Sequence, residues 1–429
     1  MGTKISFAGI DEYLAPFAPF FRRQEGRELS ACYVTGLMME GERKSVEPMS
    51  ERVHASERGM QRLLTEVKWD HEGVFKEYRR QMLAETSDPQ GILVVDDTAF
   101  PKKGTHTVCV ARQYCGALGK VANCQVGVSM SYVGQGVCWP YTMELYVPRC
   151  WDDMEDPHCA ALRKETRMPQ SAQYREKWQI ALEQIKLARQ DGVPHRAVAA
   201  DAWYGNNPEF RKGLDEMGER YVVGVYSDTE VFIDPPLFVA PQPKRRQRGR
   251  PPKRPRLIET NPPPIKVSQL SLSLEEDAWE RLELRRDSRG KPLVVEAVSR
   301  RVWPAHGYRK GISHEEVWLI IERRKQGKDH FEFRYYFSTM PQNMPTLEIV
   351  RIFHERIWIE QGYQQLKEEL GLDHHEGRTW IGWHRHVLLV FLAFGYLTRL
   401  RLQEKKRLQQ TIWKRRVERL SIQKKEVSL

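Results

Sequence analysis

The 429-residue chain is 40% hydrophobic, has a mean hydropathy of -0.61, and carries 68 Lys and Arg against 57 Asp and Glu, a formal net charge of +11. This composition is typical of a soluble globular protein with two or three domains, and it argues against a disordered chain or a membrane protein. The excess of positive charge favours a polyanionic partner, most simply nucleic acid.

The cysteines and apolar runs indicate a cytoplasmic protein. Seven cysteines, an odd number without a C-x-x-C pair, indicate free thiols rather than a zinc finger or a disulfide framework. The N-terminal stretch lacks the basic and then apolar profile of a signal peptide. The longest apolar run, residues 387–397, is shorter than the roughly 20 residues that span a bilayer, so we expect a buried helix there.

The first part of the chain, residues 1–88, is predicted to form a helical domain. Its stretch "SVEPMSERVHASERGMQRLL" has the pattern of two short helices around a turn, with Ser56 as the cap of the second helix. A DNA-contacting helix-turn-helix and a plain helical bundle both fit this pattern.

From Gly91 the pattern changes to strands, and residues 89–225 are predicted to form a mixed α/β sheet. The three runs "ILVVDD", "THTVCVARQY" and "CQVGVSMSYVG" predict successive strands. A helix over 171–192, the strand "AVAADA", a helix opened by Asn207 and Pro208, and the strand "YVVGV" follow. This order of elements favours an α/β fold.

Residues 226–345 are predicted to be a β-rich insertion with a basic loop. The stretch "PPLFVAPQPKRRQRGRPPKRPRLIETNPPPI" is rich in proline and basic residues, so we expect an exposed and largely unstructured segment. Strand-like runs return in "PLVVEAVSRRVW", "EEVWLIIERRK" and "FEFRYYFSTM". Helices within residues 346–429 are expected to complete the chain.

Two aspartates end predicted strands of the sheet, Asp96 after "ILVV" and Asp201 after "AVAA". Carboxylates at such positions are desolvated and repel one another, so a pair of them needs a cation, and Mg²⁺ prefers oxygen ligands of this kind. Strand alternation sends Asp97 to the face opposite Asp96. For either aspartate alone, a role in a turn or a helix cap explains the residue equally well.

A third carboxylate, Glu360, lies in the predicted helix "RIWIEQGYQQLKEELGL". Phe353, Arg356, Glu360 and Lys367 follow one another at intervals of three, four and seven residues, which places them on one helical stripe. A solvated face of ion pairs is the usual explanation of such a stripe. Its occurrence together with two strand-end aspartates favours a stripe that lines a site.

These features together resemble the DDE transposases of bacterial insertion sequences, whose catalytic core is an RNase H-like sheet. The signature Tyr-x2-Arg-x3-Glu-x6-Lys of similar members stands here as Phe353, Arg356, Glu360 and Lys367, with phenylalanine in place of tyrosine. The stretches 94–132, 198–225 and 356–390 resemble, in this order, the blocks of the first aspartate, the second aspartate and the glutamate.

The resemblance implies a catalytic triad of Asp96, Asp201 and Glu360 that holds two Mg²⁺ ions, with Mn²⁺ as a substitute. It also implies that Arg356 and Lys367 bind DNA phosphates, and that a homodimer in the bacterial nucleoid brings together the element ends and the target DNA. Two rival functions remain: an RNase H-like nuclease or resolvase that cuts without joining, and a transposase-derived protein that only binds DNA.

The basic loop and two lysines are further candidates for DNA binding. Arg248, Gly249, Arg250 and Pro251 form the core of an AT-hook, which lies in the narrow minor groove of A·T-rich DNA, although a flexible basic linker fits equally well. Lys102 and Lys103 follow the first aspartate, and both a DNA contact and a solvated turn explain them.

Two aromatic residues, Trp203 and Tyr204, follow the second aspartate. They are suited either to stacking on an unpaired base or to packing in the core, and we favour core packing.

Overall fold

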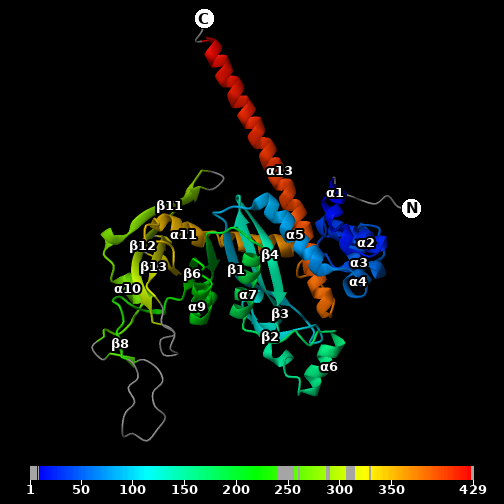
Figure 1. Ribbon diagram of the computed structural model, residues 1–429, viewed down its shortest axis with the longest axis horizontal. Helices are drawn as coiled ribbons and strands as arrows, with labels where there is room; N and C mark the ends of the chain where they lie inside the picture. Colours follow the sequence, from blue (N-terminus) through cyan, green and yellow to red (C-terminus); the bar gives the residue numbers. More distant parts are fainter. Residues whose placement is uncertain are drawn as a thin grey trace.

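The computed structural model describes residues 7, 9–239, 256–258, 261–286, 290–305, 315–327 and 330–426, with the side chains of the last helix described as far as residue 410. A twisted sheet runs through the body of the molecule, the N-terminal helices lie at one end, and the last helix projects from the body (Figure 1).

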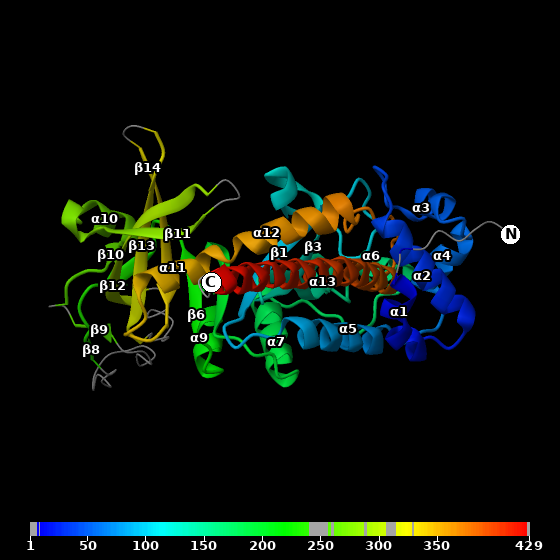
Figure 2. The same ribbon diagram turned by 90° about the horizontal axis from the view of Figure 1, so that it is seen from above.

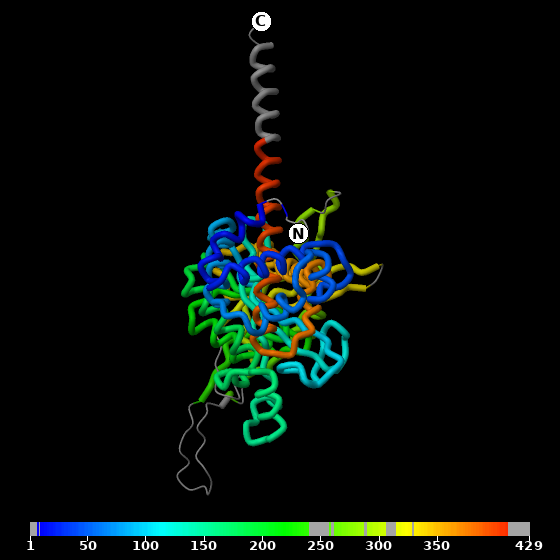
Figure 3. The backbone as a smooth tube through the Cα atoms, turned by 90° about the vertical axis from the view of Figure 1, so that its right-hand side faces the viewer, coloured from blue at the N-terminus to red at the C-terminus, as the bar shows by residue number. Residues whose placement is uncertain are grey.

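The N-terminal region is helical, as predicted. Its helices are α1 (Ile10–Leu14), α2 (Gln24–Met38), α3 (Val46–Arg52), α4 (Glu57–Thr65) and α5 (His71–Thr86). The two predicted short helices are α3 and α4, and the Ser56 side chain caps α4 by accepting a hydrogen bond from Gly59 N at 3.1 Å. Three of the helices, α2, α4 and α5, pack against the last helix, α13 (Trp380–Glu426) (Figure 3).

The apolar run near the start of α13 is buried, as predicted. Residues 387–394 are at most 4% exposed and belong to the largest hydrophobic core. Among the described residues, no helix is both long enough and apolar enough to cross a membrane.

The central sheet has the mixed arrangement that the sequence predicted. Five core strands are β1 (Ile92–Pro101), β3 (Lys120–Gly134), β4 (Val137–Leu145), β5 (Ala197–Ala200) and β6 (Tyr221–Val225). They lie in the order β4-β3-β1-β5-β6, in which β1, β3 and β4 pair antiparallel and β5 and β6 run parallel to β1. This mixed sheet with flanking helices is consistent with an RNase H-like fold.

Strand β4 was not predicted, because Pro140 interrupts its sequence pattern. In the structure the β3–β4 pairing shifts between Met130 and Ser131, so Pro140 lies beside an irregularity of the ladder. A further short strand, β2 (Ala111–Cys115), pairs with the first residues of β3.

The predicted β-rich insertion adds its strands to the core sheet. β14 (Phe331–Ser338) pairs antiparallel with β6, and β13 (Val317–Lys325) and β12 (Pro292–Pro304) follow in order. Three further strands of this part also join the sheet: β7 (Glu230–Phe232), β10 (Ile265–Lys266) and β11 (Glu280–Arg286). The result is one 12-stranded sheet, in which hydrogen bonds between strands fix the insertion to the core (Figure 2). The short strands β8 (Phe238–Val239) and β9 (Arg256–Leu257) form a separate two-stranded sheet.

The two faces of the core sheet carry different helices. On one face, Leu93 and Val95 of β1 share a core with α7 (Lys177–Gln190). On the other, Ile92 and Val94 pack with α11 (Thr346–His354) and α12 (Ile357–Gln364). Because side chains alternate along a strand, Asp96 lies on the α12 side and Asp97 on the α7 side, as predicted.

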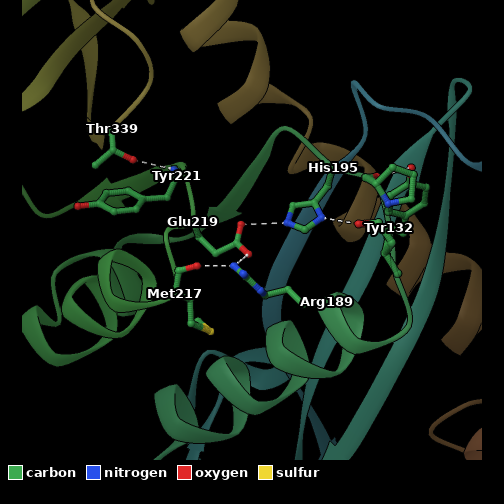
Figure 4. A network of polar contacts seen from close by, with 9 residues as sticks. Tyr132, Arg189, His195, Met217, Glu219, Tyr221 and Thr339 are labelled. Carbon is green, nitrogen blue, oxygen red and sulfur yellow. Dashed lines mark hydrogen bonds and ion pairs between the residues drawn. The ribbon is translucent and has the colours of Figure 1, made fainter.

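An ionic network of two largely buried groups, His195 and Glu219, and the exposed Arg189 lies at the starts of β5 and β6 (Figure 4). His195 Nε2 lies 3.0 Å from Glu219 Oε2, and Arg189 Nη1 lies 2.8 Å from Glu219 Oε1. Burial is the largest influence on the pKa of His195 and lowers it, but the hydrogen bonds to Glu219 and to the Val193 carbonyl, together with the charge of Glu219, outweigh burial, and the net pKa is raised. Burial acts on Glu219 in the opposite direction, and His195 and Arg189 bring the net pKa of its carboxyl below the ordinary value. We infer that this network stabilises the sheet as an ion pair.

Replacing His195 with glutamine tests this inference. The contribution of His195 is fully present below its ordinary pKa of 6.5 and is lost as the pH rises through the raised value. The contribution of Glu219 is present above 4.5 and is lost as the pH falls through the lowered value. We therefore expect His195→Gln to lower the free energy of unfolding by about 1–2 kcal/mol at about pH 5.5, and by less at about pH 8.5, in urea titrations.

The exposed pair His106 and Glu165, 3.2 Å apart, provides the control. His106→Gln is expected to change the free energy of unfolding by less than about 0.5 kcal/mol at either pH. An effect of His195→Gln that is the same at both pH values would contradict the ionic role.

Candidate active site

The pairing of two parallel strands brings Asp96 and Asp201 together. Val95 of β1 is in register with Ala200 of β5, so the aspartates occupy the next position on each strand. Asp201 also caps the short helix α8 (Ala202–Gly205), because its Oδ1 accepts hydrogen bonds from Trp203 N at 2.9 Å and from Tyr204 N at 3.1 Å. The cap and the site are therefore not alternatives for Asp201, because one carboxylate oxygen serves the cap and the other remains available.

Both carboxyls are costly to ionise where they lie. Burial raises the pKa of Asp96 to about 7; Arg356 opposes this, and Asp201 and Asp97 add repulsion. Burial also raises the pKa of Asp201, again against the opposing charge of Arg356. Among the described residues Asp96 forms a single ion pair, and it is a long one, since Arg356 Nη2 lies 3.9 Å from Asp96 Oδ2. The two aspartates thus form a site in which a bound cation is favoured.

Glu360 lies at a pocket of about 500 Å³. Its side chain is exposed, and the pocket is also lined by Arg356, by Ala202 next to Asp201, and by residues of β6 and β14. The β-rich insertion therefore supplies one wall of the pocket that contains the predicted third carboxylate.

The predicted single helix through Glu360 is wrong in detail. The helical hydrogen bonding is interrupted between His354 and Ile357, and residues Gln365–Glu369 form a π-helix. A π-helical turn holds more residues than an α-helical turn, so the regular stripe ends there. Lys367 Nζ consequently reaches β1 and donates a hydrogen bond to Ala99 O at 2.9 Å. Lys367 and Arg356 thus both contact residues of β1, and Arg356 also lines the pocket that Glu360 borders.

More than half of the chain matches one known protein family. Residues 16–291 match the family described as DDE superfamily endonuclease, a span that contains Asp96 and Asp201 and ends before Glu360. The chain belongs to the DDE superfamily endonuclease family. The resemblance predicted from the sequence is confirmed at this level.

One similar protein is a probable transposase for the insertion sequence element IS701 from Microchaete diplosiphon. It is 29% identical to this DDE-family chain over 229 residues. The alignment covers 53% of the chain and 56% of the transposase, so the chain spans a little over half the length of this relative.

DDE superfamily endonucleases use divalent metals, and two of the predicted ligands fit such an ion. Asp96 and Asp201 present adjacent carboxylates whose pKa values are raised, which is the donor chemistry that a hard cation satisfies. In the described part of the chain, no three His, Cys, Asp or Glu side chains lie close enough to hold a metal ion. The Glu360 carboxylate therefore does not lie close enough to Asp96 and Asp201 to share a metal ion with them, and the full triad stays a prediction.

The other predicted DNA-binding residues are in different environments. Lys102 Nζ donates a hydrogen bond to His375 O at 2.7 Å, and burial lowers the pKa of this amine, so Lys102 is not in a freely solvated turn. Lys103 is exposed. Arg248 and Arg250 lie outside the described residues.

The preference for core packing was right for Tyr204 and wrong for Trp203. Tyr204 is 1% exposed, but Trp203 is 41% exposed and lies edge-on to the Tyr204 ring. The Lys177 ammonium is 5.4 Å from the centre of the Trp203 ring, and it forms an ion pair with Asp97 at 2.9 Å. The α7 side of the site is therefore neutralised by a partner, in contrast to the Asp96 side.

The hydroxyls of Ser129 and Tyr363 form a pair beside Asp96 that was not predicted from the sequence. Ser129 pairs with Asp96 across the β1–β3 ladder, and its Oγ lies 2.5 Å from the Tyr363 hydroxyl of α12. Burial raises the pKa of Tyr363, and the charge of Asp96 adds to this effect. The pair holds α12 against the strand that carries the first aspartate. No local motif signals it, because it depends on the strand register.

A second missed group connects the insertion to the helices of the site. Glu322 of β13 is 2% exposed, lies 2.9 Å from His354 Nε2, and accepts a hydrogen bond from the Tyr336 hydroxyl. The Tyr336 ring in turn stacks on Phe353, with ring centres 3.9 Å apart. Phenylalanine at this signature position is therefore part of the core that positions Arg356, three residues later.

Replacing Asp96 with asparagine tests the electrostatics of the pair without any metal. Because the pKa of Asp96 lies above its ordinary value of 3.8, ionised Asp96 costs stability, and the cost grows as the pH rises from 3.8 to about 7. In a chelating buffer, we expect the gain in unfolding free energy from Asp96→Asn to be about 1–3 kcal/mol larger at about pH 8 than at about pH 5.

The neighbouring residue, Asp97, gives the control. Asp97→Asn removes a carboxylate that Lys177 already pairs, so we expect no gain in stability at either pH. If Asp96→Asn loses stability at the higher pH, the two aspartates are not the desolvated pair described here.

Proposed function

We propose that this chain is the transposase of an insertion sequence, which cuts DNA at the element ends and transfers the 3′-hydroxyl ends into target DNA. The observation that carries the proposal is the pair of desolvated carboxylates, Asp96 and Asp201, facing Arg356 in a chain of the DDE superfamily endonuclease family. The similarity to a probable insertion-sequence transposase supports the same function.

In this proposal the three carboxylates of Asp96, Asp201 and Glu360 hold two Mg²⁺ ions, for which Mn²⁺ is a substitute. When bound, the ions activate the attacking hydroxyl and stabilise the oxygen that leaves. Glu360 borders an open pocket next to the aspartates, so its side chain is free to contribute a carboxylate there.

The basic residues of the same region orient the DNA. Arg356 presents a planar guanidinium, a group that suits a phosphate, beside the carboxylates. Lys367 uses one N–H on the Ala99 carbonyl and keeps two further donors for a phosphate. A homodimer that brings two element ends together completes the proposed assembly.

The test uses a labelled duplex with the DNA that flanks the gene of this protein, a supercoiled target and Mg²⁺. We expect the wild type to cut at a defined end and join that end to the target. For Glu360→Gln we expect cleavage to fall by at least about a hundredfold with little change in DNA binding, because a metal ligand is lost at constant shape.

Glu368→Gln is the matched control, since Glu368 is exposed a few residues further on and its carboxylate accepts a hydrogen bond from Gln364. Normal cleavage is expected for this variant. Wild-type rates in Glu360→Gln would remove Glu360 from the triad. Cutting without joining would favour a nuclease or resolvase, and selective binding without cutting would favour a non-catalytic DNA-binding protein.

The basic segment calls for a separate measurement. Replacing Arg248 and Arg250 with alanine is expected to weaken duplex binding and to reduce the slope of log K against log salt by about two, because two phosphate contacts are lost. Comparing A·T-rich with G·C-rich duplexes separates an AT-hook from general phosphate binding. An unchanged slope would make the segment a linker.

A further inference from the structure

A hairpin next to the candidate active site extends past the end of β1. It consists of β2 and the first part of β3, residues 111–124, and β1 ends where Pro101 pairs with Cys124. The turn is the short helix Gly116–Leu118, closed by Gly119 at φ 62°, a left-handed conformation that favours glycine. This hairpin is named the ribbon below.

One face of the ribbon is anchored in the protein. Cys115 and Cys124 are buried with Ala99 of β1 and Val126 of β3. Side chains alternate along both strands, so this face fixes the ribbon and the other face points away from the core.

The free face of the ribbon is apolar and exposed. Tyr114 and Val121 are directly paired across the two strands, and they are 66% and 53% exposed. Leu118 in the turn is 48% exposed. An exposed apolar group of this kind on a protein surface indicates a contact with a partner.

The charged residues of the ribbon and of the chain on either side of it are all positive. Residues 98–143 contain four Lys and Arg and no Asp or Glu. Lys103, Arg112 and Lys120 are exposed, and none of them forms an ion pair within the described ranges. Arg112 lies two residues before Tyr114 and so shares its face of the strand. Lys120 is paired with Cys115 and so starts from the other face, at the end of the ribbon beside the turn. These cations are available for an anionic partner.

We propose that the exposed face of the ribbon binds duplex DNA beside the candidate active site. A two-stranded ribbon fits the major groove, so Tyr114, Leu118 and Val121 contact the groove. Arg112, on the same face, and the long side chain of Lys120, exposed beside the turn, contact phosphates on the groove edges. A second copy of the chain is a poorer partner, because two ribbons without acidic residues repel each other. The proposal rests on the proposed function in one respect, that the substrate is DNA.

The experiment measures binding of a fluorescein-labelled 30-base-pair duplex (about three helical turns) by anisotropy, in a chelating buffer and over a range of salt concentrations. For the double variant Arg112→Ala, Lys120→Ala, we expect about tenfold weaker binding and a salt slope reduced by about two. For Tyr114→Ala we expect binding several-fold weaker with an unchanged slope, since no charge is lost.

Two matched controls remove the same groups elsewhere. The double variant Arg80→Ala, Lys212→Ala loses two exposed cations that already pair with Glu77 and Glu216, and Leu272→Ala loses an 80% exposed apolar side chain. Both are expected to bind within about twofold of the wild type.

Each result decides the proposal. The expected loss of affinity and slope, absent from the controls, supports the ribbon as a DNA-binding surface. An unchanged slope in the Arg112 and Lys120 variant, or an equal loss in the controls, overturns it while leaving the proposed function intact. A wild type that binds no duplex overturns the proposed function as well. A changed oligomeric state in light scattering, without a change in slope, assigns the ribbon to self-association and overturns the proposal.

Discussion

The parallel pairing of β1 with β5 is the constraint on which the rest of the site depends. It places Asp96 and Asp201 at neighbouring strand positions, and burial makes both charges costly. The surrounding groups compensate only partly, because Arg356 approaches Asp96 no closer than 3.9 Å and the backbone of α8 satisfies one oxygen of Asp201. A site that the protein leaves underneutralised is suited to binding a cation.

At the other end of β5, by contrast, the charges of the acidic and basic side chains neutralise one another. There, Glu219 is held by His195 and Arg189 within 3.0 Å, and both ionised forms are favoured. The residues before β5 and β6 are therefore stabilised by internal ion pairs, while the other end of β5 is followed by Asp201, which with Asp96 of β1 remains a desolvated acid. Proteins accept local instability of this kind chiefly at functional sites.

Continuity of the sheet makes the insertion part of the site. Hydrogen bonds between β6 and β14 join the insertion to the core, and Glu322 and Tyr336 then contact the end of α11. These contacts fix the chain just before Arg356 and Glu360. The position of α12, which carries Glu360, is thus determined jointly by the core, through the Tyr363 hydroxyl, and by the insertion that precedes it in the chain.

The sequence alone determined the order of the elements, the mixed sheet and the separation of Asp96 from Asp97 onto opposite faces, because these follow from local periodicity. It also led to the family through short blocks of residues. Only the tertiary structure decided the break before Arg356, the contact of Lys367 with β1 and the exposure of Trp203. These features depend on strand register and on packing between distant segments, and local patterns carry no record of either.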